Sequence, residues 1–194
     1  MRKRTTCFCI LIFVFFFFGK TFALPAPAFA LPVNVTGLCF SPDGGCTRLV
    51  VDRIDHAGKN IKVMSYSFTS APISKALVRA KKRGVDVQVV IDSEEARRMP
   101  YEVRMLVERG VPVYTDTETG IFHDKVMIID GDTVITGSMN WTKAGEHANA
   151  ENLIVLKSRE LAGYYLKNFQ FHEAKSVSFK GAPVRSSGWN FKKW

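Results

Sequence analysis

The chain has 194 residues, of which 46% are hydrophobic, and it carries 27 Lys and Arg against 18 Asp and Glu. This length excludes a large multidomain protein but is sufficient for one domain with its own core, and the hydrophobic content excludes a mainly disordered chain. The formal net charge of +9 favours a polyanionic partner.

The first 30 residues have the composition of a secretory signal peptide. Arg2, Lys3 and Arg4 precede the unbroken apolar run Cys7–Phe18, and small residues with prolines follow up to Ala30. A basic start, a short apolar stretch and small residues near the cleavage point are typical of such signals. We therefore expect residues 1–30 to be removed near Ala30, leaving a periplasmic or secreted protein. A retained anchor is the alternative, although the run is shorter than the roughly 20 residues of a membrane span.

Removal of this segment lowers both the net charge and the number of cysteines. The remaining chain has 23 basic and 18 acidic residues, a charge of about +5. Cys39 and Cys46 remain, and in an oxidising compartment we expect them to pair across a loop containing Gly44 and Gly45, two free thiols being the alternative. This region has neither a Cys-x-x-Cys motif nor a Cys/His set with zinc spacing, so no metal site is predicted.

Short β-branched runs alternate with helical stretches along residues 33–114. The pattern predicts strands at Val33–Phe40, Ile61–Phe68, Val85–Ile91 and Val111–Tyr114. It predicts helices at Thr47–Ala57, Ser74–Arg83 and Glu94–Arg109, with a restart of the last at Pro100 as one alternative. A glycine follows each helix, at Gly58, Gly84 and Gly110, where it suits the left-handed conformation of a helix C-terminus. This alternation is typical of βαβ units.

The pattern then changes to a hairpin. Lys125–Ile129 and Thr133–Thr136 flank Asp130-Gly131-Asp132, which is a strong tight-turn signal and predicts two antiparallel strands. A further strand at Glu151–Leu156 and a helix at Leu161–Phe171 follow. The whole predicts an α/β fold, a mixed β-sheet flanked by helices.

We expect one catalytic domain over residues 31–175, followed by a basic and aromatic tail over residues 176–194. The tail has little periodicity and ends in several aromatic and basic residues. Stacking on nucleic acid bases or contact with a membrane is one interpretation, and a disordered terminus is the other.

Four polar residues are expected at one end of the hairpin. Side chains alternate along a strand, so His123 and Lys125 share a face. If the turn has two residues, His123 lies opposite Ser138 in one register and opposite Asn140 in the other. In both registers, the face with His123 and Lys125 meets the face with Ser138 and Asn140 across the ladder. A three-residue loop would place these side chains out of step with one another.

These residue types indicate phosphoryl transfer. Lys125, Ser138 and Asn140 carry donors suited to phosphate oxygens, and a neutral imidazole beside them is a nucleophile or a general base. No carboxylate pair accompanies them to hold a catalytic metal. Asp130 has the opposite parity to His123, so we expect it to support the turn.

Six residues have the spacing H-x-K-x4-D-x6-G-S-x-N: His123, Lys125, Asp130, Gly137, Ser138 and Asn140. This spacing resembles the HKD motif of the phospholipase D superfamily. Residues from about Val33 to Lys175 resemble its small, secreted, single-motif bacterial Nuc-type endonucleases.

The resemblance implies roles for these residues. His123 becomes the nucleophile that forms a phosphohistidine, and Lys125 and Asn140 bind the phosphate oxygens with Ser138 adjacent. Glu151 matches the carboxylate that holds the other imidazole nitrogen, which fixes the tautomer. Gly137 and Asp130 are structural positions of the motif. The family works without a metal, so no cofactor is expected.

The reaction also needs a second histidine as a general acid. His56, His147 and His172 lie outside the motif, and we expect them to be ordinary surface residues. One motif copy per chain therefore implies a homodimer in which two copies of His123 meet at a symmetric interface.

The function expected from the resemblance is that of a secreted or periplasmic, metal-independent nuclease that hydrolyses the phosphodiester bonds of DNA or RNA. A phospholipase D acting on phospholipid head groups is one alternative. A non-catalytic nucleic-acid-binding protein is the other.

Overall fold

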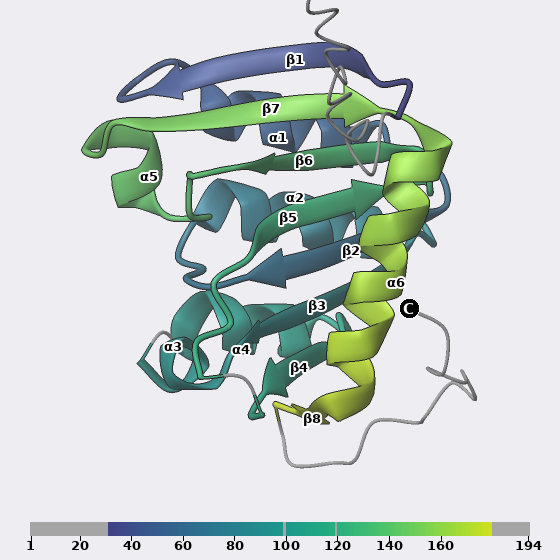
Figure 1. Cartoon of the computed structure of the whole chain (residues 1–194). Helices are drawn as coiled ribbons and strands as arrows, with labels where there is room; N and C mark the ends of the chain where they lie inside the picture. The colour runs from purple at the N-terminus through teal and green to yellow at the C-terminus, as the bar shows by residue number, and fades with distance from the viewer. Residues whose placement is uncertain (1–30, 99, 119, 180–194) are drawn as a thin grey trace, which may run out of the picture. The chain divides into compact units, whose positions relative to one another are not determined.

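The computed structural model describes residues 31–98, 100–118 and 120–179, so the expected signal segment and most of the expected tail lie outside the described residues. In this part of the chain eight strands form one sheet in the order β1-β7-β6-β5-β2-β3-β4-β8 (Figure 1). The strands are β1 (Asn34–Ser41), β2 (Asn60–Ser65), β3 (Asp86–Asp92), β4 (Val113–Asp116), β5 (Lys125–Ile129), β6 (Thr133–Gly137), β7 (Glu151–Lys157) and β8 (Ser176–Ser178).

The sheet is mixed. β2, β3 and β4 pair in parallel, and every other pairing is antiparallel. The helices are α1 (Cys46–Asp55), α2 (Ala71–Lys82), α3 (Ser93–Arg98), α4 (Pro100–Glu108), α5 (Lys143–His147) and α6 (Arg159–Lys175). The predicted α/β class with a mixed sheet is confirmed.

Helices cover both faces of the sheet. In Figure 1, α6 crosses the near face, and α1 and α2 lie behind the strands. The alternation of side chains along each strand supplies two separate cores. Val63 and Met127 belong to the core under α1 and α2, whereas Met64 and Val126 belong to the core under α6. A central strand such as β5 is therefore buried along its whole length.

The helix α2 shows how the sequence specifies this packing. Ile73, Ala76, Leu77 and Ala80 are fully buried and recur at the spacing of one helical face. Ser70 occupies the N-cap position. Burying this stripe against the sheet fixes the N-terminal end of α2 at the edge where β2 and β3 end.

Two short elements were not anticipated. The helix α5 interrupts the polar stretch before β7, and β8 lies at the start of the segment that was expected to be a tail. β8 pairs antiparallel with β4 through Tyr114 and Ser178 and forms one edge of the sheet. The folded domain therefore extends beyond residue 175. The predicted restart of a helix at Pro100 is present, because α3 and α4 are separate.

The hairpin loop has three residues, which is the alternative that breaks the parity of the two-residue registers. Ile129 pairs with Thr133 and Val126 with Thr136, so Asp130, Gly131 and Asp132 form the loop. Both two-residue registers are therefore wrong.

A disulfide joins the end of β1 to the start of α1. Cys39 and Cys46 are bonded, and their Cα atoms are 5.5 Å apart. Both residues are buried. Within the described residues there is no helix with the length and apolar character that a membrane crossing requires.

Candidate active site

The motif residues gather at one edge of the sheet. β2, β3 and β6 end at this edge, and β5 and β7 begin there. His123 lies two residues before β5 and is exposed, whereas Lys125 is the first residue of the strand and is buried. An accessible imidazole thus stands directly beside an enclosed ammonium group.

The surroundings of Lys125 control its charge. It pairs with Ser65 across the antiparallel ladder of β5 and β2, and its Nζ donates a hydrogen bond to the His123 carbonyl at 2.8 Å. Burial lowers the pKa of Lys125, and the negative charges of Asp124 and Glu151 partly oppose this effect. A buried cation beside an accessible imidazole is suited to receive a phosphate.

Tyr66 is a site residue that the sequence analysis missed. Its ring centroid lies 4.8 Å from that of His123, and the Lys125 Nζ lies 5.2 Å from the same ring. Its backbone N–H donates to the Asp124 carbonyl at 2.8 Å. Tyr66 therefore holds both motif side chains in place. The only signal in the sequence was its position at the end of a buried strand.

Glu151 lies on the same side of the sheet as Lys125. It is the first residue of β7, and its parity matches that of the buried Leu153. Its carboxylate accepts a hydrogen bond from Asn149 Nδ2 at 3.1 Å and acts electrostatically on Lys125. Among the described residues it has no hydrogen bond to His123, so its predicted role in orienting the imidazole stays a prediction.

Gly137 allows the chain to turn toward the site. Its φ is 155°, and a Cβ at this position would lie 2.2 Å from the Asn152 carbonyl oxygen, so only glycine fits. Ser138 follows outside the strand, and its Oγ accepts hydrogen bonds from the backbone N–H and the Nδ2 of Asn152 at 3.1 and 3.3 Å. Side chains therefore stop alternating between the two faces of the sheet after Gly137. For this reason the three-residue loop of the hairpin does not decide in which direction Ser138 and Asn140 point.

Asn140 has an unsatisfied oxygen. Its Oδ1 is buried and has no hydrogen-bond partner among the described residues. The next residue, Trp141, is fully buried and accepts hydrogen bonds at its carbonyl from the N–H groups of Thr69 and Ser70. The loop after β2 therefore connects both halves of the motif, with Tyr66 beside His123 and Ser70 bound to Trp141.

Asp130 supports the hairpin from the opposite edge of the sheet. Its carboxylate accepts hydrogen bonds from the N–H groups of Gly58, Lys59 and Asn60 at 2.7 to 3.0 Å. Burial alone would raise the pKa of Asp130, but these three donors together lower it below its usual value. Its φ of 54° is left-handed, a conformation that Asp tolerates.

His172 is not an ordinary surface residue. Its Nδ1 lies 2.8 Å from the buried carboxylate of Asp116, and its ring contacts Phe122 with centroids 4.9 Å apart. The Phe122 N–H donates to the Asp92 carboxylate at 3.0 Å. The segment leading into His123 is thus held from α6 and from the end of β3. His56 and His147 are exposed, as expected.

Metal ligands do not accompany this arrangement. Within residues 31–98, 100–118 and 120–179, no group of three or more His, Cys, Asp and Glu side chains could hold a metal ion. The arrangement offers an accessible imidazole, an adjacent cation and an amide, which are groups that can act on a phosphate ester.

The family follows from comparisons with known proteins. A family model described as cardiolipin synthase, PLD-like domain, matches residues 50–172. A phospholipase D of Rickettsia felis is 38% identical over 138 residues, which cover 71% of this chain and 69% of that protein. A mitochondrial cardiolipin hydrolase of Drosophila melanogaster is 31% identical over 62% of this chain and 56% of its own length.

Solved structures agree with this relationship. The crystal structure of Nuc, a phospholipase D family member from Salmonella typhimurium, has a TM-score of 0.71 and 40% identity, and the match covers 76% of this chain and 98% of that one. NucT from Helicobacter pylori shares the fold with a TM-score of 0.65 and 23% identity, over 76% and 99% of the two chains. This chain therefore belongs to the phospholipase D superfamily, in its single-domain, Nuc-type form.

Proposed function

We propose that this protein is an exported, metal-independent nuclease that cleaves the phosphodiester bonds of DNA or RNA through a phosphohistidine on His123. The observation that carries the proposal is the exposed imidazole of His123 beside the buried ammonium of Lys125. The net positive charge and the resemblance of the motif to Nuc-type endonucleases favour a polyanionic substrate.

Each side chain has a defined step in this reaction. One ring nitrogen of His123 attacks phosphorus while Lys125 and Asn140 stabilise the charge on the phosphate oxygens. The bond between phosphorus and the leaving oxygen breaks, and that oxygen takes a proton from a second histidine. Water then attacks the phosphohistidine, gives its proton to the second histidine and releases His123.

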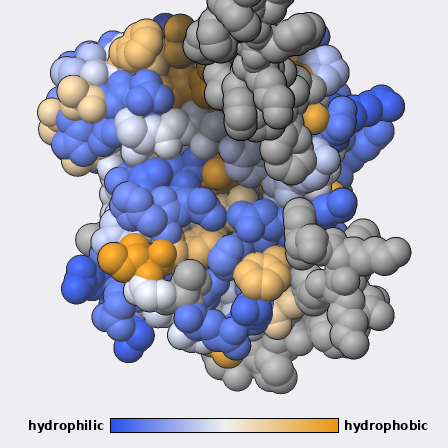
Figure 2. All heavy atoms as spheres, in the orientation of Figure 1, coloured by the Kyte–Doolittle hydropathy of each residue, from blue (hydrophilic) through white to orange (hydrophobic). Residues whose placement is uncertain are grey.

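A second copy of the chain supplies the second histidine in this proposal. The edge strand β1 exposes three large apolar side chains, Val35, Leu38 and Phe40, which are 61%, 55% and 62% exposed. Figure 2 shows hydrophobic residues over β1 on a face that is otherwise largely hydrophilic. Leu38 and Phe40 lie on the α6 side of the sheet, and β1 ends at the edge that carries the motif. This apolar strip is available for contact with a second copy.

A lipid substrate is the second candidate function. Relatives of this chain are named phospholipase D and mitochondrial cardiolipin hydrolase. A lipid phosphodiester can be attacked by the same kind of nucleophile. The two functions differ in the molecule that must reach His123, and a direct comparison of substrates separates them.

The test uses the purified mature chain with excess EDTA, plasmid DNA in one assay and cardiolipin vesicles in the other. The His123→Ala variant is compared with the wild type, and His56→Ala is the matched control, because His56 is exposed and outside the site. We expect the wild type and His56→Ala to cut DNA and His123→Ala to be inactive. Hydrolysis of cardiolipin without cutting of DNA would support the lipid function, and inactivity of the wild type on both would contradict an enzyme.

The export part of the proposal is supported by the Cys39–Cys46 disulfide, since such bonds persist mainly in oxidising compartments. Residues 1–30, the proposed signal peptide, lie outside the described residues. N-terminal sequencing of protein recovered from the periplasm or medium should begin near residue 31. Recovery only from the cytoplasm, with Met1 present, would contradict export.

A further inference from the structure

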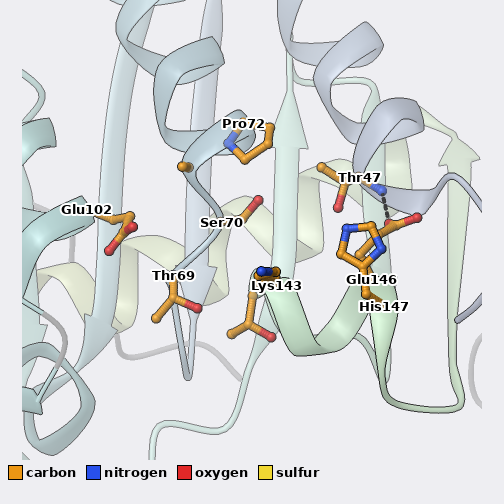
Figure 3. A pocket seen from close by; sticks show the side chains of 10 residues that line it. Thr47, Thr69, Ser70, Pro72, Glu102, Lys143, Glu146 and His147 are labelled. Atoms are coloured by element: carbon orange, nitrogen blue, oxygen red, sulfur yellow. Dashed lines mark hydrogen bonds between the residues drawn. The ribbon is translucent and has the colours of Figure 1, made fainter. Parts of the chain in front are cut away.

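A groove adjoins the active site and takes no part in the steps described above. Two cavities of about 400 and 540 Å³ share Thr47, Pro72, Glu146 and His147 in their walls, so they form one continuous depression. Figure 3 shows the smaller cavity, in which Lys143 lies between Ser70 on one side and Glu146 on the other. We call this depression the α5 groove, because α5 forms part of its wall.

The α5 groove begins where the motif ends. Its lining includes Thr142 and Lys143, which follow Asn140 by two and three residues. Three residues span at most about 11 Å between Cα atoms. The groove therefore begins within about 11 Å of Asn140, counted along the chain between Cα atoms. The lining also includes Thr69, from the same loop that places Tyr66 against His123.

The acidic residue in the centre of the groove is held in place by the backbone. Glu146 is buried, and its carboxylate accepts hydrogen bonds from the N–H groups of Gly45 and Thr47 at 3.0 and 2.5 Å. His147 Nδ1 lies 2.6 Å from the Asp43 carboxylate. These contacts fix the positions of Glu146 and Asp43 in the wall.

Lys143 is the cation that lines the smaller cavity, and Arg48 lines the larger one. Lys143 is exposed, and within the described part of the chain no carboxylate pairs with it. Hydroxyl groups surround it in the lining, and Thr142 Oγ1 accepts from the Gly145 N–H at 2.9 Å, which leaves its own O–H free to donate. Glu102 lies at the other end of the cavity from His147 (Figure 3). An anion is therefore favoured near Lys143 and disfavoured near Glu102.

We propose that the α5 groove binds the phosphate next to the scissile one in a nucleic acid strand, with Lys143 as its cationic ligand. The inference rests on the proposed nuclease function and specifies how that substrate is held. An acyl chain is a poor alternative occupant, because the apolar lining consists of small or short side chains, Val51, Ala71 and Pro72.

The test measures binding of a fluorescently labelled single-stranded oligonucleotide to the inactive His123→Ala protein over a series of NaCl concentrations. Adding Lys143→Gln should lower the slope of log K against log salt by about 0.7, the value for one phosphate contact on a single strand. Lys143→Arg should retain the slope. Lys157→Gln is the matched control, since it removes the same charge at the far end of β7, about 20 Å from Glu151.

A second measurement uses the enzyme with an intact His123. Replacing Lys143 by Gln should lower the ratio of kcat/KM for an oligonucleotide to kcat/KM for bis(4-nitrophenyl) phosphate, which has no neighbouring phosphate. If the wild type cuts DNA while Lys143→Gln and Lys157→Gln have the same salt slope and the same ratio of kcat/KM values, the proposed phosphate site at Lys143 is wrong. In that case the proposed nuclease function is unaffected. If the wild type neither binds nor cuts nucleic acid, both proposals fail.

Discussion

The ring of Tyr66 lies 4.8 Å from the ring of His123 at an angle of 57°, and the same ring is 5.2 Å from the Nζ of Lys125. Tyr66 is a positioning residue in our account, because it limits the movement of both side chains. Tyr66→Ala should lower kcat/KM by about 100-fold, the typical effect of a displacement of about 1 Å at a reacting group. Steady-state kinetics on plasmid DNA measures this loss.

Tyr66→Phe is the matched control for this prediction. It retains the ring and should keep activity within a few-fold of the wild type. Equal losses in both variants would show that the hydroxyl, and not the ring, is the important group. Full activity of Tyr66→Ala would show that the ring contact has no role in positioning.

The lowered pKa of Lys125 predicts how kcat/KM falls on the alkaline side of its pH profile. Its pKa is below the ordinary 10.5, first because of burial, while Asp124 and Glu151 act in the opposite direction. A lysine with a lowered pKa loses its positive charge at a lower pH than an exposed lysine, so phosphate binding should weaken before pH 10.5 is reached. Glu151→Gln removes one charge that raises this pKa and should move the alkaline limb of kcat/KM to lower pH.

The pH at which the alkaline limb of kcat/KM falls distinguishes two roles of Glu151. A loss of kcat alone is expected if Glu151 only orients His123, whereas a shift of the limb requires its electrostatic effect on Lys125. Glu160→Gln, at the exposed start of α6, removes the same charge at the opposite edge and should leave the limb in place. A limb that is identical in wild type and Glu151→Gln would contradict the prediction.

Asp130 should contribute to stability in a pH-dependent way. Its three backbone donors lower its pKa in the folded state, so its contribution is present above the unfolded pKa near 3.9 and is lost as the pH falls through the folded value. Asp130→Asn should lower the free energy of unfolding by about 1–3 kcal/mol at neutral pH. Urea denaturation at pH 7 and at acidic pH measures this.

Asp132→Asn is the control in the same loop. Its carboxylate accepts from Thr133 Oγ1 at 2.7 Å and lies 3.6 Å from the Lys157 Nζ, a surface contact of small expected value. If Asp132→Asn lowered the free energy of unfolding as much as Asp130→Asn, the prediction that Asp130 has a special stabilising role would be contradicted.

The disulfide should stabilise the domain by about 2 kcal/mol, the entropic value for a short closed loop. Cys39 and Cys46 are separated by seven positions in the sequence. A reductant should lower the urea midpoint of the wild type and leave that of the Cys39→Ala, Cys46→Ala double variant unchanged. Equal midpoints for oxidised and reduced wild type would contradict this stabilisation.

Local patterns in the sequence predicted most of the architecture. The β-branched runs around Val63, Val89 and Met127 form central strands, because their residues are buried on both faces. The turn at Asp130-Gly131-Asp132 predicted the hairpin but not its register. The loop length depends on hydrogen bonds from Gly58, Lys59 and Asn60 to Asp130, about 70 residues away, which a local pattern does not contain.

Contacts between distant segments explain the other differences. Tyr66 reaches His123 only when β2 pairs with β5, and His172 meets Asp116 across 56 residues. β8 has little hydrophobic pattern of its own and is a strand because β4 offers an unpaired edge. The spacing of His123, Lys125 and Asn140 indicated the chemistry, whereas the environment that tunes it is tertiary.

The most direct test of the account is to trap the covalent intermediate. The wild type and His123→Ala are mixed with a labelled oligonucleotide in EDTA for less than one turnover, quenched in alkali and analysed by peptide mass spectrometry. We predict a nucleotide phosphoryl group on His123 of the wild type and none on the variant, which should also form no product. Product formation without any adduct on His123, or an active His123→Ala protein, would contradict the account.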